Sequence, residues 1–412
     1  MDAFLVRYKI QENVWSKIAE VIINILFIYP RMFHPHRGGI ERVSDLLCRE
    51  LIKRKHKVLF LHNICDESLE DYPYPAPIYF FPFSVQEVEK NAPFYRNFLI
   101  EHHVDIVINQ DIMAYHALCR FSKDISGVKA ISVLHLSPLN MYDHLFGLTM
   151  RLRNKSWIEK VKRIARVIKI PKIKSDYWQN LKVCYDDCFL YTDLFCLLSS
   201  KFIPELKRIH PGDMERVVAI GNPNTYTTQT FIETKKKQLL YVGRIEWYQK
   251  RVDRLIDIWR YLYQDFPDWE LVIVGDGPTR KELEQKSSKM ERVVFAGYQN
   301  PDSFYRDASI LCMTSDFEGW GMVLTEAMTF GTIPVAFNSF AAITDIIEDG
   351  QTGVLVPPFS CKQFARKLGV LMKDEELRRE MSKHCMEHVK RFDIQNVVDE
   401  WEKVFDRLKN NQ

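Results

Sequence analysis

The sequence predicts an α/β protein made of two doubly wound domains, each with a parallel β-sheet covered by helices on both faces. The chain has 412 residues, which is more than one ordinary hydrophobic core accommodates, so two domains are expected. In both halves, apolar strands alternate with glycine-containing turns and amphipathic helices, as in parallel sheets. Such sheets bind ligands outside the carboxyl ends of their strands, which predicts a cleft between the domains.

The composition is that of a folded cytosolic protein. Hydrophobic residues make up 46% of the chain, charged residues make up 27%, and the net charge is +3. No apolar run reaches the ~18–20 residues of a membrane span, and the first residues lack the pattern of a signal peptide. The nine cysteines lie mostly in apolar runs, and Cys184 and Cys188 have no second pair at zinc spacing. We therefore expect reduced thiols in the core.

The first half opens with a βαβ unit that suits an anion. Residues 21–29, VIINILFIY, are apolar at nearly every position, as in a strand covered on both faces. Gly38 and Gly39 then precede a helix, and a second strand follows at 57–62. Glycines let backbone N–H groups approach an anion at a helix N-terminus. A purely structural role for the glycine pair remains the alternative at this point.

Further strands of the first half are expected at 78–83, 104–109 and 129–137, and residues 192–206 are interpreted as a strand followed by a helix. His135 lies near the carboxyl end of the 129–137 strand, where parallel sheets bind ligands. Capping of the strand or pairing in the core explains this histidine equally well.

Residues 151–174, RLRNKSWIEKVKRIARVIKIPKIK, form a strongly basic segment. It has ten Lys or Arg residues against one acid, Glu159, and its apolar residues, including Trp157, recur at helical spacing. A basic amphipathic helix with a Trp is typical of contact with anionic lipid. A solvated helix packed on its own domain is an equal alternative. No aromatic-rich RNA-binding pattern or helix-turn-helix accompanies the segment, which disfavours nucleic acid.

A turn and a polar segment separate the halves, and residues 225–237 are interpreted as the linker. Arg244 then directly follows an apolar strand, and Lys250 lies at the entrance of the next helix. An arginine fork and a lysine point charge beside a helix N-terminus can hold a pyrophosphate. A pair of unrelated surface cations is the alternative interpretation.

Two later stretches of the second half suit a nucleotide and a sugar. Gly297 and Tyr298 follow a strand, where they are placed to meet a nucleobase by backbone and stacking contacts. The stretch from Glu318 to Glu326 runs from a strand through a turn bracketed by glycines into a helix, and it carries two carboxylates eight positions apart. Strands at 332–338 and 353–358 and the final helices complete a second doubly wound sheet.

Taken together, GGIERV, His135 at a strand end, GR-x5-K, VGDGP and the E-x7-E of EGWGMVLTEAM-x-x-G-x-P-V resemble the retaining GT-B glycosyltransferases of family 4, the glycosyl transferases group 1. The resemblance covers about residues 22–404. It implies the GT-B architecture, in which two Rossmann-like domains face a central cleft and a C-terminal helix returns to the first domain. The expected division is an extension (1–20), an acceptor-side domain (21–225) with the insertion 151–174, a nucleotide-sugar-binding domain (226–390) and the crossing helix (391–412).

The resemblance also implies roles for individual residues, with a nucleotide sugar as substrate and no required metal or other cofactor. Arg244 and Lys250 would hold the diphosphate, Glu326 the ribose hydroxyls and Glu318 the sugar hydroxyls, and His135 would contact the sugar near the transition state. Glycines and backbone amides would supply the other donor contacts: Gly38 and Gly39 at the diphosphate, and Gly319, Trp320, Gly321 and Met322 at the sugar and phosphate. Front-face substitution needs no glycosidase pair of acids.

The function that follows from the resemblance is the transfer of a hexosyl unit to a glycan or lipid-linked acceptor in cell-surface polysaccharide, lipopolysaccharide or oligosaccharide biosynthesis. A UDP-sugar ranks first as donor on the breadth of the family. The segment 151–174 fits members that act at the inner membrane face, so we expect a cytoplasmic protein that binds this face peripherally. The alternatives are a non-catalytic nucleotide-sugar-binding protein and a nucleotide-sugar epimerase on the same fold. The chain departs from the family pattern at 221–224, Gly-Asn-Pro-Asn, and at Trp320, where Phe is more common.

Overall fold

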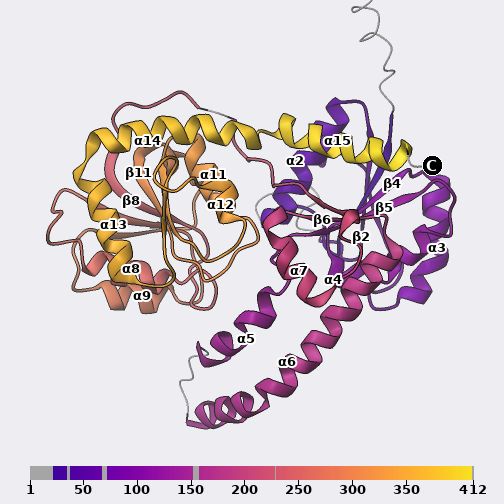
Figure 1. Ribbon diagram of the computed structural model, residues 1–412, viewed down its shortest axis with the longest axis horizontal. Coiled ribbons are helices and arrows are strands. Elements are labelled where there is room, and N and C mark those ends of the chain that lie inside the picture. Colours follow the sequence, from indigo (N-terminus) through magenta and orange to yellow (C-terminus); the bar gives the residue numbers. More distant parts are fainter. Residues whose placement is uncertain (1–21, 35–37, 67–71, 152–156, 228, 411–412) are drawn as a thin grey trace, which may run out of the picture.

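The computed structural model describes residues 22–34, 38–66, 72–151, 157–227 and 229–410, and Figure 1 shows two lobes bridged by helices. The first lobe contains a seven-stranded parallel sheet in the order β3-β2-β1-β4-β5-β6-β7. Its strands are β1 (Asn24–Ile28), β2 (Lys57–His62), β3 (Ile78–Phe80), β4 (Ile106–Asn109), β5 (Lys129–Leu134), β6 (Leu194–Leu197) and β7 (Val217–Ala219). Residues 1–20, interpreted from the sequence as an extension, lie outside the described residues.

The first sheet is apolar on both faces because helices cover both. Ile25 and Phe27 of β1 belong to one core cluster, whereas Leu26 and Ile28 point into another. The strand predicted at 21–29 is therefore confirmed as β1. The helical elements of this domain are α2 (Gly39–Lys53), α3 (Val88–Glu101), α4 (Ile112–Tyr115), η2 (Leu118–Ser122), η3 (Ser200–Phe202), α7 (Ile203–Ile209) and η4 (Met214–Arg216).

The second lobe contains a six-stranded parallel sheet in the order β10-β9-β8-β11-β12-β13. Its strands are β8 (Lys236–Val242), β9 (Glu270–Val274), β10 (Val293–Gly297), β11 (Ala308–Met313), β12 (Ile333–Phe337) and β13 (Val354–Val356). Its helical elements are α8 (Val252–Arg260), α9 (Arg280–Ser287), α10 (Asp302–Asp307), α11 (Met322–Thr329), α12 (Ile343–Ile346), α13 (Cys361–Lys373), α14 (Glu375–His388) and η5 (Val389–Phe392). The predicted pair of doubly wound α/β domains is confirmed.

Each sheet has a point at which the strand order reverses. In the first, β1 lies between β2 and β4, and in the second, β8 lies between β9 and β11. Loops that leave the carboxyl ends of such neighbouring strands diverge to opposite faces of the sheet, which opens space for a ligand. The loops after β1, β8 and β11 carry Gly38, Arg244 and Glu318, so the fold places three of the predicted site regions at these two points.

The C-terminal helix α15 (Ile394–Asn410) crosses back to the first domain, as the sequence predicted. Val398, Trp401 and Phe405 are buried in the same core cluster as Ile25 and Phe27 of β1. Figure 1 shows α14 lying over the second domain and α15 lying over the first. The chain therefore passes between the domains a second time near Phe392, which ends η5.

Helices α5 (Asn140–Arg151) and α6 (Trp157–Tyr191) form a hairpin that projects from the first domain (Figure 1). The C-terminal part of α6 is packed into the domain through Leu181, Tyr185 and Phe189. The sequence predicted a helix only over the basic residues 151–174, but α6 begins at Trp157 and continues to Tyr191. Within the described residues, no helix has the length and hydropathy of a membrane span.

Candidate functional site

The predicted site residues of the two domains meet where the strand ends face each other. A methyl group added at Gly319 would lie 1.9 Å from the carbonyl oxygen of His135, and one at Gly39 would lie 3.7 Å from Cγ of Met322. The turn after β11 therefore packs against the loop after β5 and against the start of α2. Gly319 is required here because any side chain would collide with the His135 backbone.

Two helix N-termini converge at this contact. Helix α2 begins at Gly39, and α11 begins at Met322 after Gly321, which has a left-handed φ of 87°. The N-cap residues Gly38 and Gly321 have no side chain that could cap the first N–H groups. The first N–H groups and the helix dipoles favour an anion at this junction. The structure thus brings Gly38 and Gly39 together with the turn 319–322, and their contacts with a donor stay a prediction.

Lys250 and Glu318 form one ion pair rather than two separate groups. Nζ of Lys250 donates to Oε1 of Glu318 at 2.7 Å, and Nε2 of Gln249 donates to Oε2 of the same carboxylate at 3.2 Å. Glu318 is buried, whereas the Lys250 side chain is 27% exposed. Lysine has three N–H donors, so Lys250 can keep Glu318 and still bind a phosphate oxygen.

Arg244 lies beside an acid that sequence reasoning missed. Its side chain is 64% exposed, and its Nε lies 3.7 Å from Oε2 of Glu246. Glu246 is itself buried, and this burial raises its pKa, although a hydrogen bond with Tyr248 and the charges of Arg244 and Lys250 oppose the shift. The sequence signal was an acid between the two predicted cations, in GRIEWYQK.

Glu326 is buried and accepts hydrogen bonds from three parts of the chain. Arg42 of α2 donates to its Oε1 at 2.7 Å, Thr225 donates to the same oxygen at 2.8 Å, and Tyr305 donates to Oε2 at 2.8 Å. Burial alone would lower the pKa of Arg42. The interactions with Glu326 and with nearby tyrosines are stronger, so the pKa of Arg42 is raised. A carboxylate accepts about four hydrogen bonds, so little capacity remains. The ribose contact of Glu326 stays a prediction, and Arg42 was missed.

His135 follows β5 and is held by Gln110, whose side-chain oxygen pairs with Nε2 of the imidazole. Burial lowers the pKa of His135 to about 4, so the ring is neutral at pH 7. Because Nε2 faces the Gln110 oxygen, which is an acceptor, the ring proton is on Nε2. Nδ1 then carries a lone pair, and it has no hydrogen-bond partner among the described residues. Gln110 and His135 line a small pocket together with Asn222.

Of the remaining residues predicted to contact the donor, Gly297, Tyr298 and the side chain of Trp320 lie away from the junction of α2 and α11. Gly297 ends β10, the edge strand of its sheet, and Tyr298 is 73% exposed there. The indole of Trp320 is buried against Phe392, with ring centroids 5.3 Å apart, and against Gly221. The side chain of Trp320 therefore belongs to the packing where the chain crosses between the domains, and only its backbone faces the anion site. Among the described residues, no His, Cys, Asp and Glu side chains are grouped to hold a metal ion.

Comparison with known sequences gives a consistent match in the second half. Residues 224–387 match the family model for Glycosyl transferases group 1. An uncharacterized glycosyltransferase of Haemophilus influenzae is 30% identical over 190 residues, which are 45% of this chain and 54% of the relative. The GalNAc-alpha-(1->4)-GalNAc-alpha-(1->3)-diNAcBac-PP-undecaprenol alpha-1,4-N-acetyl-D-galactosaminyltransferase of Campylobacter jejuni is 28% identical over 58% of this chain and 66% of the relative. The matches thus span about half to two thirds of these relatives.

Solved structures resemble the whole chain in fold. HepE from Anabaena in complex with UDP-glucose has a TM-score of 0.70 at 16% identity, over 93% of this chain and 100% of that one. The lipopolysaccharide outer core galactosyltransferase WaaB, in its apo form, has a TM-score of 0.67 at 19% identity, with the same coverages. These likenesses establish a shared fold over nearly the whole chain.

Proposed function

From the match of its second domain to the Glycosyl transferases group 1 family, we propose that this protein is a retaining glycosyltransferase. It moves a hexosyl unit from a nucleotide sugar, with a UDP-sugar as first candidate, to a glycan or lipid-linked acceptor. The observation that carries the proposal is the junction of two helix N-termini beside Lys250, Arg244 and Glu318 at the facing strand ends. The UDP-glucose complex of HepE and the undecaprenol-linked substrate in the Campylobacter relative's name support this choice of donor and acceptor.

The chemistry assigned to the junction is the stabilisation of a leaving nucleoside diphosphate. The bond between the anomeric carbon and the β-phosphate oxygen breaks, the acceptor hydroxyl bonds to that carbon on the same face, and its proton passes to the leaving phosphate. Negative charge therefore grows on the phosphate. Lys250, which Glu318 holds, and the N–H groups of α2 and α11 are in place before the reaction, so they stabilise that charge without reorganising, and Arg244 adds a second cation. We propose on this basis that the transfer needs no divalent metal.

Glu318 and His135 have supporting roles in this proposal. Glu318 is fixed by Lys250 and Gln249. A buried carboxylate held in this way can orient sugar hydroxyls by accepting hydrogen bonds from them. The neutral imidazole of His135 offers Nδ1 as a hydrogen-bond acceptor. Neither residue needs to act as a nucleophile or a general base in a front-face substitution.

The experiment that tests the proposed function measures nucleotide release by the purified chain. Membranes carrying candidate acceptors are incubated with UDP-, GDP- and ADP-sugars, with and without EDTA. We expect acceptor-dependent release of UDP at a rate that EDTA leaves unchanged, and an α-anomeric product by NMR from an α-linked donor. Release of no nucleotide, with any donor, would support a binding protein instead. Interconversion of free nucleotide sugars without acceptor would support an epimerase.

We also propose that the projecting hairpin of α5 and α6 binds the surface of an anionic membrane. On the described part of α6, Ile168 is 74% exposed, Ile173 is exposed, and Lys169 and Lys172 are exposed beside them. A helix that presents isoleucines and lysines together is typical of an interfacial helix. Peripheral binding at the inner membrane face would bring a lipid-linked acceptor to the first domain.

A further inference from the structure

The residue next to Lys250 has an unusual backbone. Arg251 precedes α8 with φ 49° and ψ 46°, in the left-handed region. This conformation is unfavourable for a residue with a long side chain and is kept only where its surroundings enforce it. Here the guanidinium is fixed at two points: Nε and Nη2 donate to the carboxylate of Asp253 at 2.9 and 2.8 Å. The residue with this left-handed backbone conformation therefore directly follows Lys250 in the loop.

The segment after β11 holds the Lys250 loop by its backbone. The N–H of Asp316 donates to the carbonyl of Gln249 at 2.8 Å. The hydroxyl of Thr314 lies 3.2 Å from the carbonyl oxygen of Lys250 and 3.0 Å from that of Arg251. The same segment carries Glu318, so one stretch fixes both the backbone of Lys250 and the partner of its Nζ.

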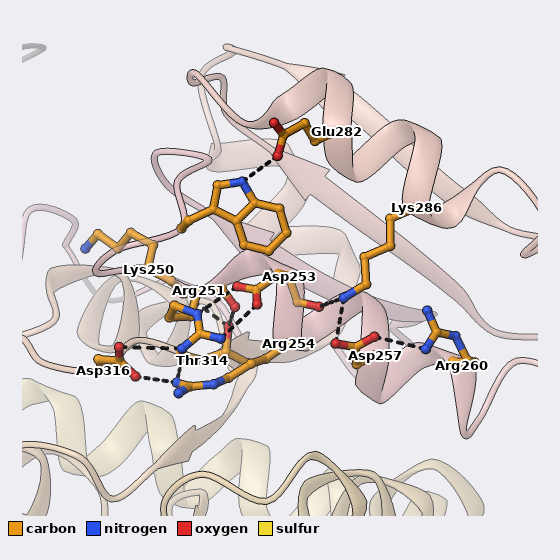
Figure 2. Close-up of polar contacts among 11 residues, drawn as sticks. Lys250, Arg251, Asp253, Arg254, Asp257, Arg260, Glu282, Lys286, Thr314 and Asp316 are labelled. Atoms are coloured by element: carbon orange, nitrogen blue, oxygen red, sulfur yellow. Dashed lines mark hydrogen bonds and ion pairs between the residues drawn. The ribbon is translucent and has the colours of Figure 1, made fainter. Parts of the chain in front are cut away.

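Asp316 joins this loop to α8 through two arginines. Its carboxylate is 2.5 Å from Nη1 of Arg254 and 3.7 Å from Nη1 of Arg251. Asp316 is 1% exposed, and the guanidinium of Arg254 is covered by the ring of Phe359 at 4.1 Å. Figure 2 shows Arg251, Arg254 and Asp316 close together, with the side chain of Lys250 pointing away from them. The carboxylate of Asp316 is thus enclosed by its arginine partners.

We propose that Asp316 is a positioning residue for Lys250. It pairs with the buried guanidinium of Arg254 and, at a longer distance, with that of Arg251, keeps Arg251 in its left-handed conformation and thereby aims Nζ of Lys250 at Glu318 and the diphosphate site. Removing the charge of Asp316 leaves the buried Arg254 without this partner beside Arg251, and the two guanidinium groups repel each other although Asp253 still pairs with Arg251. Arg251 then relaxes to an ordinary backbone conformation, and Lys250 turns away. The inference rests on the proposed function for the role of Lys250, but not for its position.

The test has two separate readouts: the chemical accessibility of Lys250 in protein without added donor, and kcat. Asp316→Asn should raise the rate at which an amine-acetylating reagent modifies Lys250 at least 3-fold, as quantified by mass spectrometry, and should lower kcat at least 10-fold. Thr314→Val, which loses only the hydroxyl, should increase the labelling in the same direction. Asp257→Asn is the matched control, because Asp257 pairs with Lys286 and Arg260 one turn further along α8 than Asp253, the partner of Arg251, and it should change neither readout.

A double variant tests whether Arg251 transmits the effect. Glycine adopts the left-handed conformation without cost, so Asp316→Asn combined with Arg251→Gly should recover kcat to within 3-fold of the wild-type value. Unchanged labelling of Lys250 in both Asp316→Asn and Thr314→Val, in folded protein, would overturn the inference, as would a double variant no better than Asp316→Asn. If the labelling responds but Lys250→Ala remains fully active, the positioning stands and the proposed role of Lys250 in catalysis fails.

Discussion

Lys250 and Glu318 neutralise each other across 2.7 Å, so the donor meets a balanced pair instead of a free cation. We predict that Lys250→Ala and Arg244→Ala each lower kcat/KM at least 100-fold, which corresponds to about 2.7 kcal/mol of lost transition-state stabilisation. The measurement is the steady-state rate with the donor that the nucleotide-release experiment identifies. Lys286→Ala, which removes a cation on α9, is the control and should retain the wild-type rate. Near-normal activity in both site variants would remove these residues from the diphosphate site.

Two buried histidines predict how stability changes with pH. Burial lowers the pKa values of His62 and His135 to about 4, against about 6.5 in the unfolded chain. Above pH 6.5 neither state binds the proton. As pH falls from 6.5 to 4, the unfolded state binds protons first, so stability is lost in this window, by up to about 3 kcal/mol for each histidine. Urea unfolding at pH 7.5, 5.5 and 4.5 should show this loss. His62→Gln, which lies outside the candidate site, should flatten the pH dependence, and an unchanged slope would contradict it.

Between elements, a large side chain packs closely against a glycine where the chain crosses from one domain to the other. A methyl group added at Gly221 would lie 2.6 Å from Cη2 of Trp320, so the large indole and the glycine fit only together. We predict that Gly221→Ala destabilises the protein by about 1–3 kcal/mol through overpacking. Trp320→Phe removes the colliding atoms, so the double variant should be more stable than Gly221→Ala alone. Thermal unfolding of the four proteins measures this coupling, and strictly additive effects would contradict it.

How far the sequence predicted the structure depended on whether a feature is local. The strands β1 and β2 and the helix α2 followed from apolar patterns and the glycine pair, and the turn 319–322 followed from its glycines. Helix α6 was predicted too short because its residues after 174 alternate between exposed and buried faces without the basic signal that identified the rest. Arg42 and Glu326 are 284 positions apart, and no periodicity or spacing joins them. Glu246 and Asp316 had a visible charge but no local sign that they are buried.

At the scale of the molecule, ion pairs and hydrogen bonds hold the two domains together without a ligand. Arg42 of the first domain reaches Glu326, and Ser199 and Lys201 both reach Asp345 of α12. Removing one partner of a buried pair leaves an uncompensated charge and costs more than the pair contributes. We therefore predict that Arg42→Ala raises KM for the donor and increases the radius of gyration of the empty protein in small-angle scattering.

The control for that prediction is Lys201→Ala, which breaks a more exposed contact between the same domains. It should change the radius of gyration less than Arg42→Ala, because exposed ion pairs contribute little. Saturating nucleotide should restore the wild-type radius in Arg42→Ala if the donor closes the domains. A scattering curve identical to that of the wild-type protein would show that Arg42 does not hold them.

The projecting hairpin makes a prediction about where the whole molecule works. Each basic residue near an anionic surface contributes about 1 kcal/mol, so neutralising five residues of 151–174, for example Lys162, Arg163, Lys169, Lys172 and Lys174, should remove about 5 kcal/mol. Cosedimentation with vesicles of anionic lipid should be salt-sensitive in the wild-type protein and lost in this variant, while zwitterionic vesicles bind neither. Activity on a water-soluble acceptor should persist, because the N-terminal part of α6, from Trp157, lies away from the sheets (Figure 1). If the variant still binds anionic vesicles like the wild-type protein, the hairpin is a solvated helix pair, and the acceptor reaches the first domain by another surface.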